Sequence, residues 1–291
     1  MASLRDIRTK IRAVKNIKQI TQAMKMVAAA RLRRVQARVN AGKPYSQQMR
    51  ELVSTLSRAA GQIQHPLLEQ RESGKIGFVL ITSDKGLCGS YNGNIIRKGV
   101  NFVKEHQNRG VKMITVGKKS GDFFRRRNYD IHASFNQIGV AASYAGVKTI
   151  ADAITGIFLD GTVNEVYIGY TEFLTTIQQR PTIVKFLPIE PPQEEDAAAR
   201  KHAEVEYLFE PPAEQLLATL LPRYVNSQVY QMLLECVASE FGARMTAMSN
   251  ATENAGELIK SLDLTYNKAR QASITKELLE VVSGAEALRA A

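Results

Sequence analysis

Residues 4–39 read LRDIRTKIRAVKNIKQITQAMKMVAAARLRRVQARV, a run that contains neither proline nor glycine. Most of its apolar residues recur three or four positions apart, which is the spacing of one face of an α-helix. The stretch therefore predicts one long amphipathic helix that needs a partner along its apolar face. That face consists of Leu4, Ile7, Ile11, Val14, Ile17, Met24, Val27, Leu32, Val35 and Val39.

This helix has a counterpart at the other end of the chain. Gly42 and Pro44 predict a kink or break, after which helical spacing resumes to about residue 58. Helix formers also dominate from Pro212 to Val282, with Pro222 expected in the first turn of the main helix. At a rise of 1.5 Å per residue the two helices would span roughly 82 and 105 Å. Helices of this length do not fit a compact sphere, and if they pack together they must be antiparallel.

The difference in length predicts that the C-terminal end of the second helix extends past its partner. Apolar residues are found there on more than one face of the helix, so this end needs an apolar sleeve. The alternative is that the helix folds back or frays. The residues concerned are Ile274, Leu278, Leu279, Val281 and Val282.

Between the two helices, the sequence changes to alternating strand and helix patterns. Helical patterns at 93–108, 118–127 and 142–158 alternate with apolar runs, which predicts a largely parallel sheet with helices on its faces. The last strand, PTIVKFLPI, is expected to lie antiparallel to the one before it. The other runs are KIGFVLIT at 75–82, VKMITVG at 111–117, YDIHASF at 129–135 and VNEVYIGY at 163–170.

The predicted fold class is α/β, combining a long antiparallel two-helix coiled coil with a central domain built on a mostly parallel sheet. The N-terminal helix takes residues 1–58, the α/β domain 75–190, and the C-terminal helix 213–291. Residues 191–212 form a connector that is rich in proline and acidic residues, with a short ordered piece expected at EYLFEP, 206–211.

The positive charge of the chain is concentrated at its N-terminus. The net charge is +11, yet residues 1–50 carry thirteen Lys and Arg against the single acid Asp6, a balance of +12. We refer to residues 1–50 as the basic arm. Composition leaves four interpretations open: a grip on nucleic acid, binding to an anionic membrane, an organelle transit peptide, or contact with an acidic protein.

The chain shows no stretch of eighteen apolar residues and no secretory signal at its N-terminus, so we expect it neither to span a membrane nor to be exported. Cys88 and Cys236 are far apart and lack other ligands at metal-binding spacing, which predicts reduced thiols and no structural zinc.

The loop SDKGLCGSYNG at 83–93 is the candidate for chemistry, because Asp84, Lys85 and Cys88 lie among three glycines after an apolar run. The glycine spacing matches neither the dinucleotide fingerprint nor the phosphate loop. Asp and Gly are common turn formers, and no sequence motif supplies a base for the thiol, which favours a structural or contact role. A ligand crevice at the carboxyl ends of the strands stays open as an alternative.

Five stretches closely resemble the gamma subunit of the rotary F-type ATP synthase, and they cover essentially the whole chain. They are ITQAMKMVAAARL at 20–32, SDKGLCG at 83–89, EYLFEP at 206–211, RYVNSQVYQMLLE at 223–235 and YNKARQASITKELLEVVSGAEAL at 266–288. The resemblance implies an antiparallel coiled coil of terminal helices with a Rossmann-like α/β domain, in agreement with the architecture reached from periodicity.

By this resemblance the chain is a central rotor that makes no bonds itself. It would turn within three alpha and three beta subunits, rest with epsilon on the membrane ring of c subunits, and couple ion flow to ATP synthesis or hydrolysis. It would bind no cofactor, and MgATP or MgADP would be held by the partner subunits. The expected location is the cytoplasmic face of a bacterial plasma membrane, since the sequence shows neither a transit segment nor the cysteine pair of the chloroplast form.

The resemblance also assigns contact residues by position. The basic arm would face an acidic helix-turn-helix of beta. The remaining assignments come from three regions that match the family: the loop at 83–89, the end of the C-terminal helix at 270–275, and residues 207–210 near the expected c-ring contact. Expected contacts to the catalytic subunits are Met24, Lys25, Arg31, Arg33, Arg34, Asp84, Lys85, Cys88, Arg270, Gln271 and Thr275, and the expected c-ring contacts are Tyr207 and Glu210. The apolar C-terminal tip would sit in the hydrophobic collar of the hexamer.

Two rival functions make different predictions. A nucleic-acid-binding protein would show salt-dependent affinity that is lost when Arg31, Arg33 and Arg34 are neutralised. An α/β enzyme would show turnover by the isolated chain that depends on Asp84 or Lys85.

Overall fold

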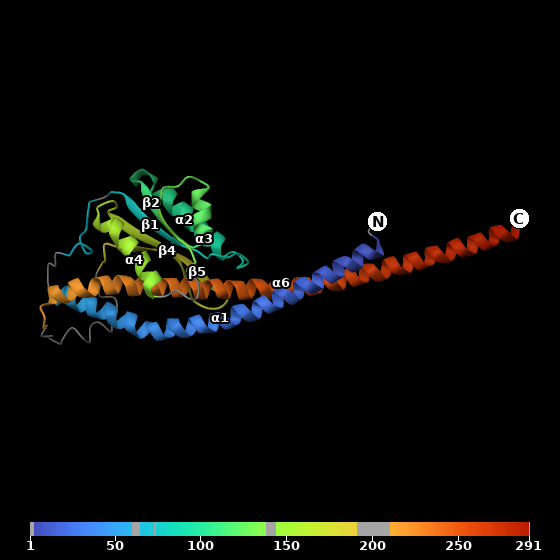
Figure 1. Ribbon diagram of the computed structural model, residues 1–291, viewed down its shortest axis with the longest axis horizontal. Coiled ribbons are helices and arrows are strands. Elements are labelled where there is room, and N and C mark those ends of the chain that lie inside the picture. Colours follow the sequence, from blue (N-terminus) through green and yellow to red (C-terminus); the bar gives the residue numbers. More distant parts are fainter. Residues whose placement is uncertain (1–2, 60–64, 73, 138–143, 191–209, 291) are drawn as a thin grey trace. The chain divides into compact units, whose positions relative to one another are not determined.

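A computed structural model describes residues 3–59, 65–72, 74–137, 144–190 and 210–290. They fall into two compact units (Figure 1). One unit comprises the residues up to Val27 together with those from Met245 onward, and the other comprises Ala28–Arg244. The two longest helices, α1 and α6, each contribute to both units.

Helix α1 spans Leu4–Ala59 and passes through Gly42 and Pro44 without a break. A proline inside a helix removes one backbone hydrogen bond, which is why a kink or break was expected there. The helix continues because its buried face continues: Val39 and Met49, on either side of Pro44, are both 6% exposed. Packing on this face outweighs the local preference of the two residues.

Helix α6 spans Ala213–Ala290, and Pro222 lies inside it rather than in its first turn. The expectation for Pro222 is therefore wrong. The helix begins earlier because the residues before the proline already form a helical apolar face, with Leu217 and Leu221 completely buried in the core.

In the first unit the two helices form an antiparallel pair. Arg8 donates to the Tyr266 hydroxyl, Thr252 donates to the Thr21 hydroxyl at 2.8 Å, and Lys25 donates to the Ser249 hydroxyl at 2.9 Å. As the position on α1 advances from 8 to 25, its partner on α6 recedes from 266 to 249. The predicted antiparallel arrangement is confirmed. Buried contact residues along this pair include Ile7, Ile11, Met248 and Ala255.

The second unit is built on a five-stranded sheet in the order β3-β2-β1-β4-β5. The pairs β1–β2, β1–β4 and β2–β3 are parallel, and the pair β4–β5 is antiparallel, as predicted. The order reverses direction at β1, because β2 and β3 extend the sheet on one side while β4 and β5 extend it on the other. The strands are β1 Ile76–Ile81, β2 Val111–Val116, β3 Ile131–Phe135, β4 Glu165–Phe173 and β5 Gln179–Leu187.

Both faces of this sheet are covered by helices, so the central strands are buried throughout (Figure 1). In β1, Phe78 and Leu80 point to the face packed by α2 and α3, while Val79 and Ile81 point to the face packed by α4, α1 and α6. Continuous apolar strands of this kind are typical of parallel sheets. The helices are α2 Tyr91–Glu105, α3 Lys118–Arg125 and α4 Tyr144–Leu159, with a short 3-10 turn η1 at Gln107–Arg109.

The predicted α/β class with long terminal helices is confirmed. The strand and helix patterns of the sequence correspond to the observed elements, with ends that differ by a few residues. Of the EYLFEP stretch, residues 206–209 lie outside the described residues. Among the described residues, no helix combines the length and hydropathy that crossing a bilayer requires.

Gly117 tests the tight packing between the ends of β1 and β2. Its φ is +94°, and a Cβ atom there would lie 2.2 Å from the Thr82 carbonyl oxygen. We expect Gly117→Ala to lower the free energy of unfolding by more than about 3 kcal/mol, because it adds a backbone clash to an unfavourable φ. Urea denaturation followed by circular dichroism measures this change.

Two matched alanine substitutions separate the causes. Gly161 has a φ of +71° with no atom within 4 Å of the added Cβ, so Gly161→Ala should cost only about 1–2 kcal/mol. Gly156 lies in α4 with open space around it, so Gly156→Ala should be neutral or stabilising by up to about 1 kcal/mol. Equal losses at Gly117 and Gly161 would contradict the close approach to Thr82.

Candidate functional site

The loop after β1 lies at the carboxyl ends of the parallel strands, where open α/β sheets commonly bind ligands. Here the chain's own helix α6 covers the position. Leu233, Cys236, Val237 and Glu240 of α6 approach the ends of β1 and β2, and the space left among them is a cavity of about 20 Å³. This is room for about one water molecule. The alternative of a ligand crevice at this place is therefore not supported.

Asp84 is engaged by the backbone of its own unit. Its Oδ1 accepts hydrogen bonds from the amide of Lys118, at the start of α3, at 3.0 Å, and from the amide of Gln137, after β3, at 3.1 Å. A carboxylate that bonds two backbone amides ties neighbouring loops together. Lys85 is exposed, and so is Leu87, which adopts a φ of 62° and leaves 64% of its surface accessible. These two side chains form the outer surface of the loop.

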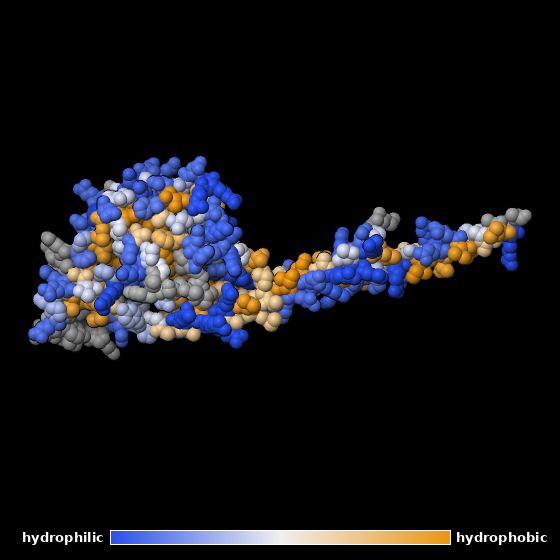
Figure 2. Space-filling model, viewed as in Figure 1, coloured by the Kyte–Doolittle hydropathy of each residue, from blue (hydrophilic) through white to orange (hydrophobic). Residues whose placement is uncertain are grey.

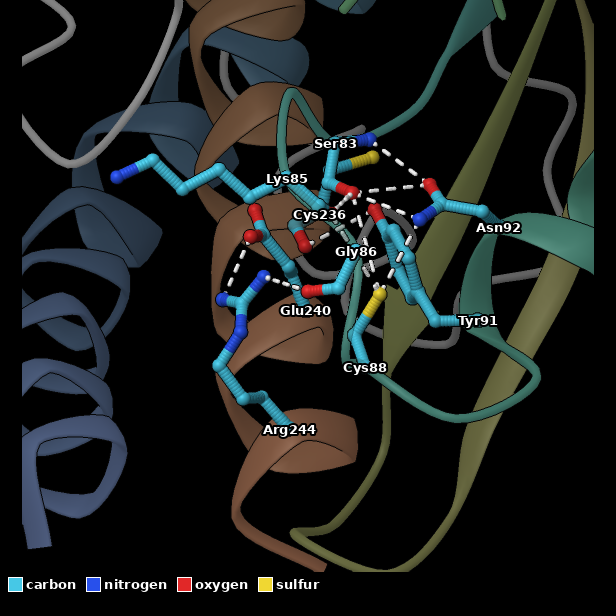
Figure 3. Close-up of polar contacts among 9 residues, drawn as sticks. All are labelled: Ser83, Lys85, Gly86, Cys88, Tyr91, Asn92, Cys236, Glu240 and Arg244. Carbon is cyan, nitrogen blue, oxygen red and sulfur yellow. Dashed lines mark hydrogen bonds and ion pairs between the residues drawn. The ribbon is translucent and has the colours of Figure 1, made fainter. Parts of the chain in front are cut away.

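Cys88 lies beneath that surface and is only 2% exposed. Its sulfur accepts a hydrogen bond from Asn92 Nδ2 at 3.1 Å and lies 3.9 Å from both the Ser83 hydroxyl and the Lys85 carbonyl (Figure 3). Burial raises the pKa of the Cys88 thiol, while the Ser83 hydroxyl opposes the shift. A buried, protonated thiol without a histidine among these partners fits a structural role rather than a nucleophile.

A network of hydrogen bonds joins the loop and the sheet to α6, and Figure 3 shows the part of it that involves the loop and Tyr91. The Tyr91 hydroxyl donates to the Cys236 carbonyl at 3.1 Å, and the Thr171 amide of β4 points to the Cys236 sulfur at 3.4 Å. Ser239 donates to the Thr171 carbonyl at 3.1 Å. Burial raises the pKa of Cys236 to about 12 and that of Tyr91 well above its ordinary value. Both side chains are therefore neutral at physiological pH.

Sequence reasoning missed the ion pair that completes this network. Glu240 and Arg244 lie one turn apart on α6, their side chains are 15% and 10% exposed, and their charged groups meet at 2.7 Å. Arg244 also donates to the Gly86 carbonyl at 3.0 Å, which links α6 to the loop (Figure 3). The sequence signal was an acid and an arginine four residues apart on a predicted helix. Their loop partner cannot be read from this spacing.

The basic arm presents most of its charge to solvent. Arg31, Arg33 and Arg34 are exposed, and the Arg31 guanidinium lies over the Phe241 ring at 5.7 Å. Met24 and Lys25 are half-buried, because this part of α1 packs along α6 in the first unit. The structure thus separates three exposed arginines from two residues that take part in the helix pair.

The C-terminal end of α6 is exposed on several sides. Arg270, Gln271 and Thr275 are exposed, with Thr275 donating to the Gln271 carbonyl within the helix at 3.0 Å. Apolar surface continues along this end, seen as orange in Figure 2. Exposed fractions are 47% for Ile274, 61% for Leu278 and Leu279, 71% for Val281 and 58% for Val282.

Glu210 and Tyr207 are the remaining candidate residues. Glu210 is exposed just before the helix, and Tyr207 lies outside the described residues. Within the described parts of the chain, no three His, Cys, Asp or Glu side chains lie close enough to hold a metal ion.

Removing Arg244 should destabilise the chain in a pH-dependent way. Burial raises the pKa of Glu240, and Arg244 opposes that shift. In Arg244→Met this opposition is lost, so folding favours the protonated carboxyl still more, and stability falls as pH rises through the folded-state pKa. We expect a loss of about 2–4 kcal/mol at pH 8 and a smaller loss at pH 5, measured by urea denaturation.

Two variants control this experiment. Glu240→Gln combined with Arg244→Met removes the unpaired charge and should recover much of the loss at pH 8. Lys276→Met breaks an exposed pair of the same spacing, with Glu280 at 3.5 Å, and should cost less than about 0.5 kcal/mol. A loss in Arg244→Met that is the same at both pH values would show that the charge of Glu240 does not cause it.

Cys236 should make stability fall at alkaline pH. Its folded pKa of about 12 exceeds the value near 8.5 of a free thiol, so folding favours the protonated form. The contribution of the buried thiol to the free energy of unfolding is complete below about pH 8.5. Above that pH it falls by about 1.4 kcal/mol for each pH unit. We expect the difference in unfolding free energy between the original chain and Cys236→Ala to shrink between about pH 8.5 and 10.5. If the difference in unfolding free energy between the two proteins stayed constant with pH, the thiol of Cys236 would not have a raised pKa in the folded chain.

Comparison with known proteins places this geometry in a family. A family model described as ATP synthase matches residues 3–288. The ATP synthase gamma chain of Desulforamulus reducens is 48% identical over 288 residues, covering 99% of this chain and all of that protein. The gamma chain of Desulfitobacterium hafniense is 47% identical with the same coverage.

Solved structures show the same fold. A chain of the central stalk and c-ring structure of Tetrahymena thermophila mitochondrial ATP synthase matches with a TM-score of 0.61 and 26% identity, covering 80% of this chain and 99% of that one. A chain of the Euglena gracilis mitochondrial ATP synthase reaches a TM-score of 0.75 at 22% identity, covering 99% and 95%. Because the family model and the bacterial relatives span almost the whole sequence, this chain belongs to the ATP synthase gamma chain family.

Proposed function

We propose that this chain, as the central-stalk rotor of an F-type ATP synthase, transmits torque through surface contacts alone and makes or breaks no bond itself. The observation that carries this proposal is the continuity of α6. One helix from Ala213 to Ala290 begins in the core of the sheet unit and ends as an exposed tip with apolar residues on several sides. A rotor needs such a rigid element between a driven end and a working end.

The partners follow from the family and its solved assemblies. The Euglena structure contains F1 and the c ring, and the Tetrahymena structure contains the central stalk and the c ring. The proposed partners are three alpha and three beta subunits around the helices, with epsilon and the c ring at the foot. Glu210 and Tyr207 are the proposed c-ring contacts, and the proposed location is the cytoplasmic face of a bacterial plasma membrane.

A rotor acts by presenting different surfaces to three equivalent sites. Each partner site responds only to the difference between the contacts that it makes in its alternative states. The exposed arginines of α1 offer charged surface to such sites, and the tip of α6 offers apolar surface. A bias of a few kcal/mol per site is enough to change which state is populated.

The basic arm supplies the proposed contacts in the lower part of the shaft. Exposed Arg31, Arg33 and Arg34, together with Lys85 on the loop, form a positive surface suited to acidic segments of the catalytic subunits. Met24, Lys25, Asp84 and Cys88 are further proposed contacts to the catalytic subunits. Cys88 is buried and Asp84 bonds backbone amides, so these two residues hold the loop in place. We therefore assign the outer contact to the exposed side chains of Lys85 and Leu87.

The upper contacts are proposed at the tip. Arg270, Gln271 and Thr275 are exposed and available for hydrogen bonds to the hexamer, and the apolar residues beyond them would be covered by an apolar collar. Burying this surface would stabilise the assembly, since the apolar side chains are now in water.

Catalysis and nucleotide binding belong in this proposal to the partner subunits. The loop that resembled an active site has its carboxylate bonded to amides, its thiol buried and protonated, and the adjoining crevice filled by α6. We propose that the chain binds no cofactor and that MgATP and MgADP are held by alpha and beta.

Reconstitution tests the rotor function. The purified chain is mixed with alpha and beta subunits and MgATP, and any complex is isolated by size before its composition and hydrolysis rate are measured. We expect three alpha, three beta and one copy of this chain, with faster turnover than the mixture without it. A chain that stays outside the hexamer, and instead binds single-stranded DNA in a salt-dependent way, would favour the nucleic-acid function of the basic arm.

Charge reversal tests the contact residues separately from the function. We expect Arg33→Glu with Arg34→Glu to lower the rate or coupling of the reconstituted complex by about tenfold at low salt, and less at high salt, because exposed charges are screened. Lys104→Glu on the exposed side of α2 is the control and should leave the rate unchanged. If both changes left the rate and the coupling intact, the contact assignments would be wrong although the family would stand.

A further inference from the structure

Strand β3 is a free edge of the sheet, five residues long, and its register with β2 shifts between the pairs Met113–Ile131 and Ile114–Ala133. It pairs with β2 on one side only, and within the described residues no strand lies on the other side. Natural sheets usually protect such edges with proline or lysine. The opposite edge, β5, carries Pro181 and Lys185, whereas β3 reads IHASF and carries neither. The shortness of β3 and its register shift limit the length of strand that can pair there, but the edge still offers backbone donors and acceptors to a short added strand.

A cavity of about 480 Å³ lies beside this edge. Its lining includes Arg125 at the end of α3, together with Asn128 and Tyr129, which follow that helix. His132, Ala133 and Ser134 of β3 also line it. The lining combines a charged group, small residues and one aromatic ring. A side chain projecting from an added strand would find both polar and apolar contacts there.

The surface around the cavity is strongly positive. Residues 111–135 hold six basic residues and two acids, Asp122 and Asp130, a balance of +4. The exposed side chains of Arg125, Arg126 and Arg127 are consecutive, and none of them forms an ion pair with a carboxylate in the described chain.

One of the three arginines is held in position. The Arg127 guanidinium lies 3.7 Å from the centre of the Phe123 ring, and its Nη1 donates to the Phe123 carbonyl at 3.3 Å. A stacked guanidinium keeps donors free for a planar acceptor such as a carboxylate. Arg127 is therefore a preorganised cation two positions along the chain from Arg125, which itself lines the cavity beside β3.

We propose that the free edge of β3, with Arg125, Arg126 and Arg127, docks an extended acidic segment of a partner protein, which adds to the sheet as a sixth strand. The backbone edge selects an extended polypeptide, because only a strand matches the spacing of its amides and carbonyls. The arginines select carboxylates within that polypeptide. A membrane surface or a nucleic acid would satisfy the charge but leave the backbone edge unpaired. This site is on the sheet and does not depend on the proposed rotor contacts.

The first experiment uses the full chain and a synthetic peptide of about seven residues that alternates glutamate and valine. Binding is followed by fluorescence anisotropy, and the amide exchange of β3 by mass spectrometry. We expect the peptide to bind and to slow exchange in residues 131–135, while a lysine–valine peptide does neither. Reversing Arg125, Arg126 and Arg127 to glutamate should weaken binding by at least about tenfold.

Two further measurements distinguish strand addition from simple charge attraction. In an extended peptide the amides of alternate residues point to opposite edges of the strand, and N-methylation removes an amide donor. Methylating the residues whose amides face β3 should abolish binding, and methylating the other set should preserve it. Replacing Arg97, Lys98 and Lys104 of α2 by glutamate is the matched control. It changes the net charge by the same amount at positions outside β3 and α3, so peptide binding should stay nearly unchanged. Equal binding of both methylated peptides would refute strand addition. Tighter binding to vesicles of anionic lipid or to single-stranded DNA than to the peptide would overturn the proposed partner.

Discussion

The structure depends above all on the burial of one side of α6 in the core of the sheet unit. Leu217, Leu221, Val225, Val229 and Leu233 recur every four residues, and none of them is more than 2% exposed. Each contributes roughly 1.5–3 kcal/mol relative to exposure. This packing makes the beginning of α6 part of the domain core, while its last residues face solvent. The same backbone thus belongs both to a folded domain and to an exposed shaft.

The polar contacts around α6 become understandable from this burial. A helix laid across the carboxyl ends of parallel strands confronts loop carbonyls and hydroxyls that would otherwise lose their hydrogen bonds to water. Tyr91, Ser239 and Arg244 answer this need by bonding carbonyl groups of Cys236, Thr171 and Gly86. The result is a loop fixed to the helix, with Lys85 and Leu87 held on its outer side. The loop whose sequence suggested chemistry is thus joined to α6 through the Gly86 carbonyl.

The sequence was sufficient for the elements because their periodicity is a local property. The three-and-four spacing of α1 and the apolar runs of the strands survive in the structure, since burial on these faces is what the pattern records. Local rules failed at Gly42, Pro44 and Pro222, where tertiary packing maintains the helix through residues that disfavour it. In these places the free energy of burial exceeds the cost of a missing hydrogen bond.

The candidate site was less predictable because its partners are distant in sequence. Arg244 and Gly86 lie 158 positions apart, and Asp84 meets an amide 53 positions away. No spacing rule reports such contacts. The burial of Cys88 beneath its own loop was likewise hidden, since a small thiol among glycines has the same sequence whether it faces inward or outward. The sequence identified Asp84, Lys85 and Cys88 as candidates, but whether each side chain is buried or exposed, and what it bonds, depends on the fold.

The proposed rotor also explains why so little of the exposed shaft is built for specific hydrogen bonds. A surface that must turn past several partners needs interactions that weaken gradually as the distance or angle changes. Charges in water at physiological salt act over about 8 Å, and apolar contacts have no preferred direction. The exposed arginines of α1 and the apolar tip of α6 are of these two kinds. Directional bonds instead hold parts of the chain to one another, as where α6 is bonded to the loop and to β4 in the unit that would receive the torque.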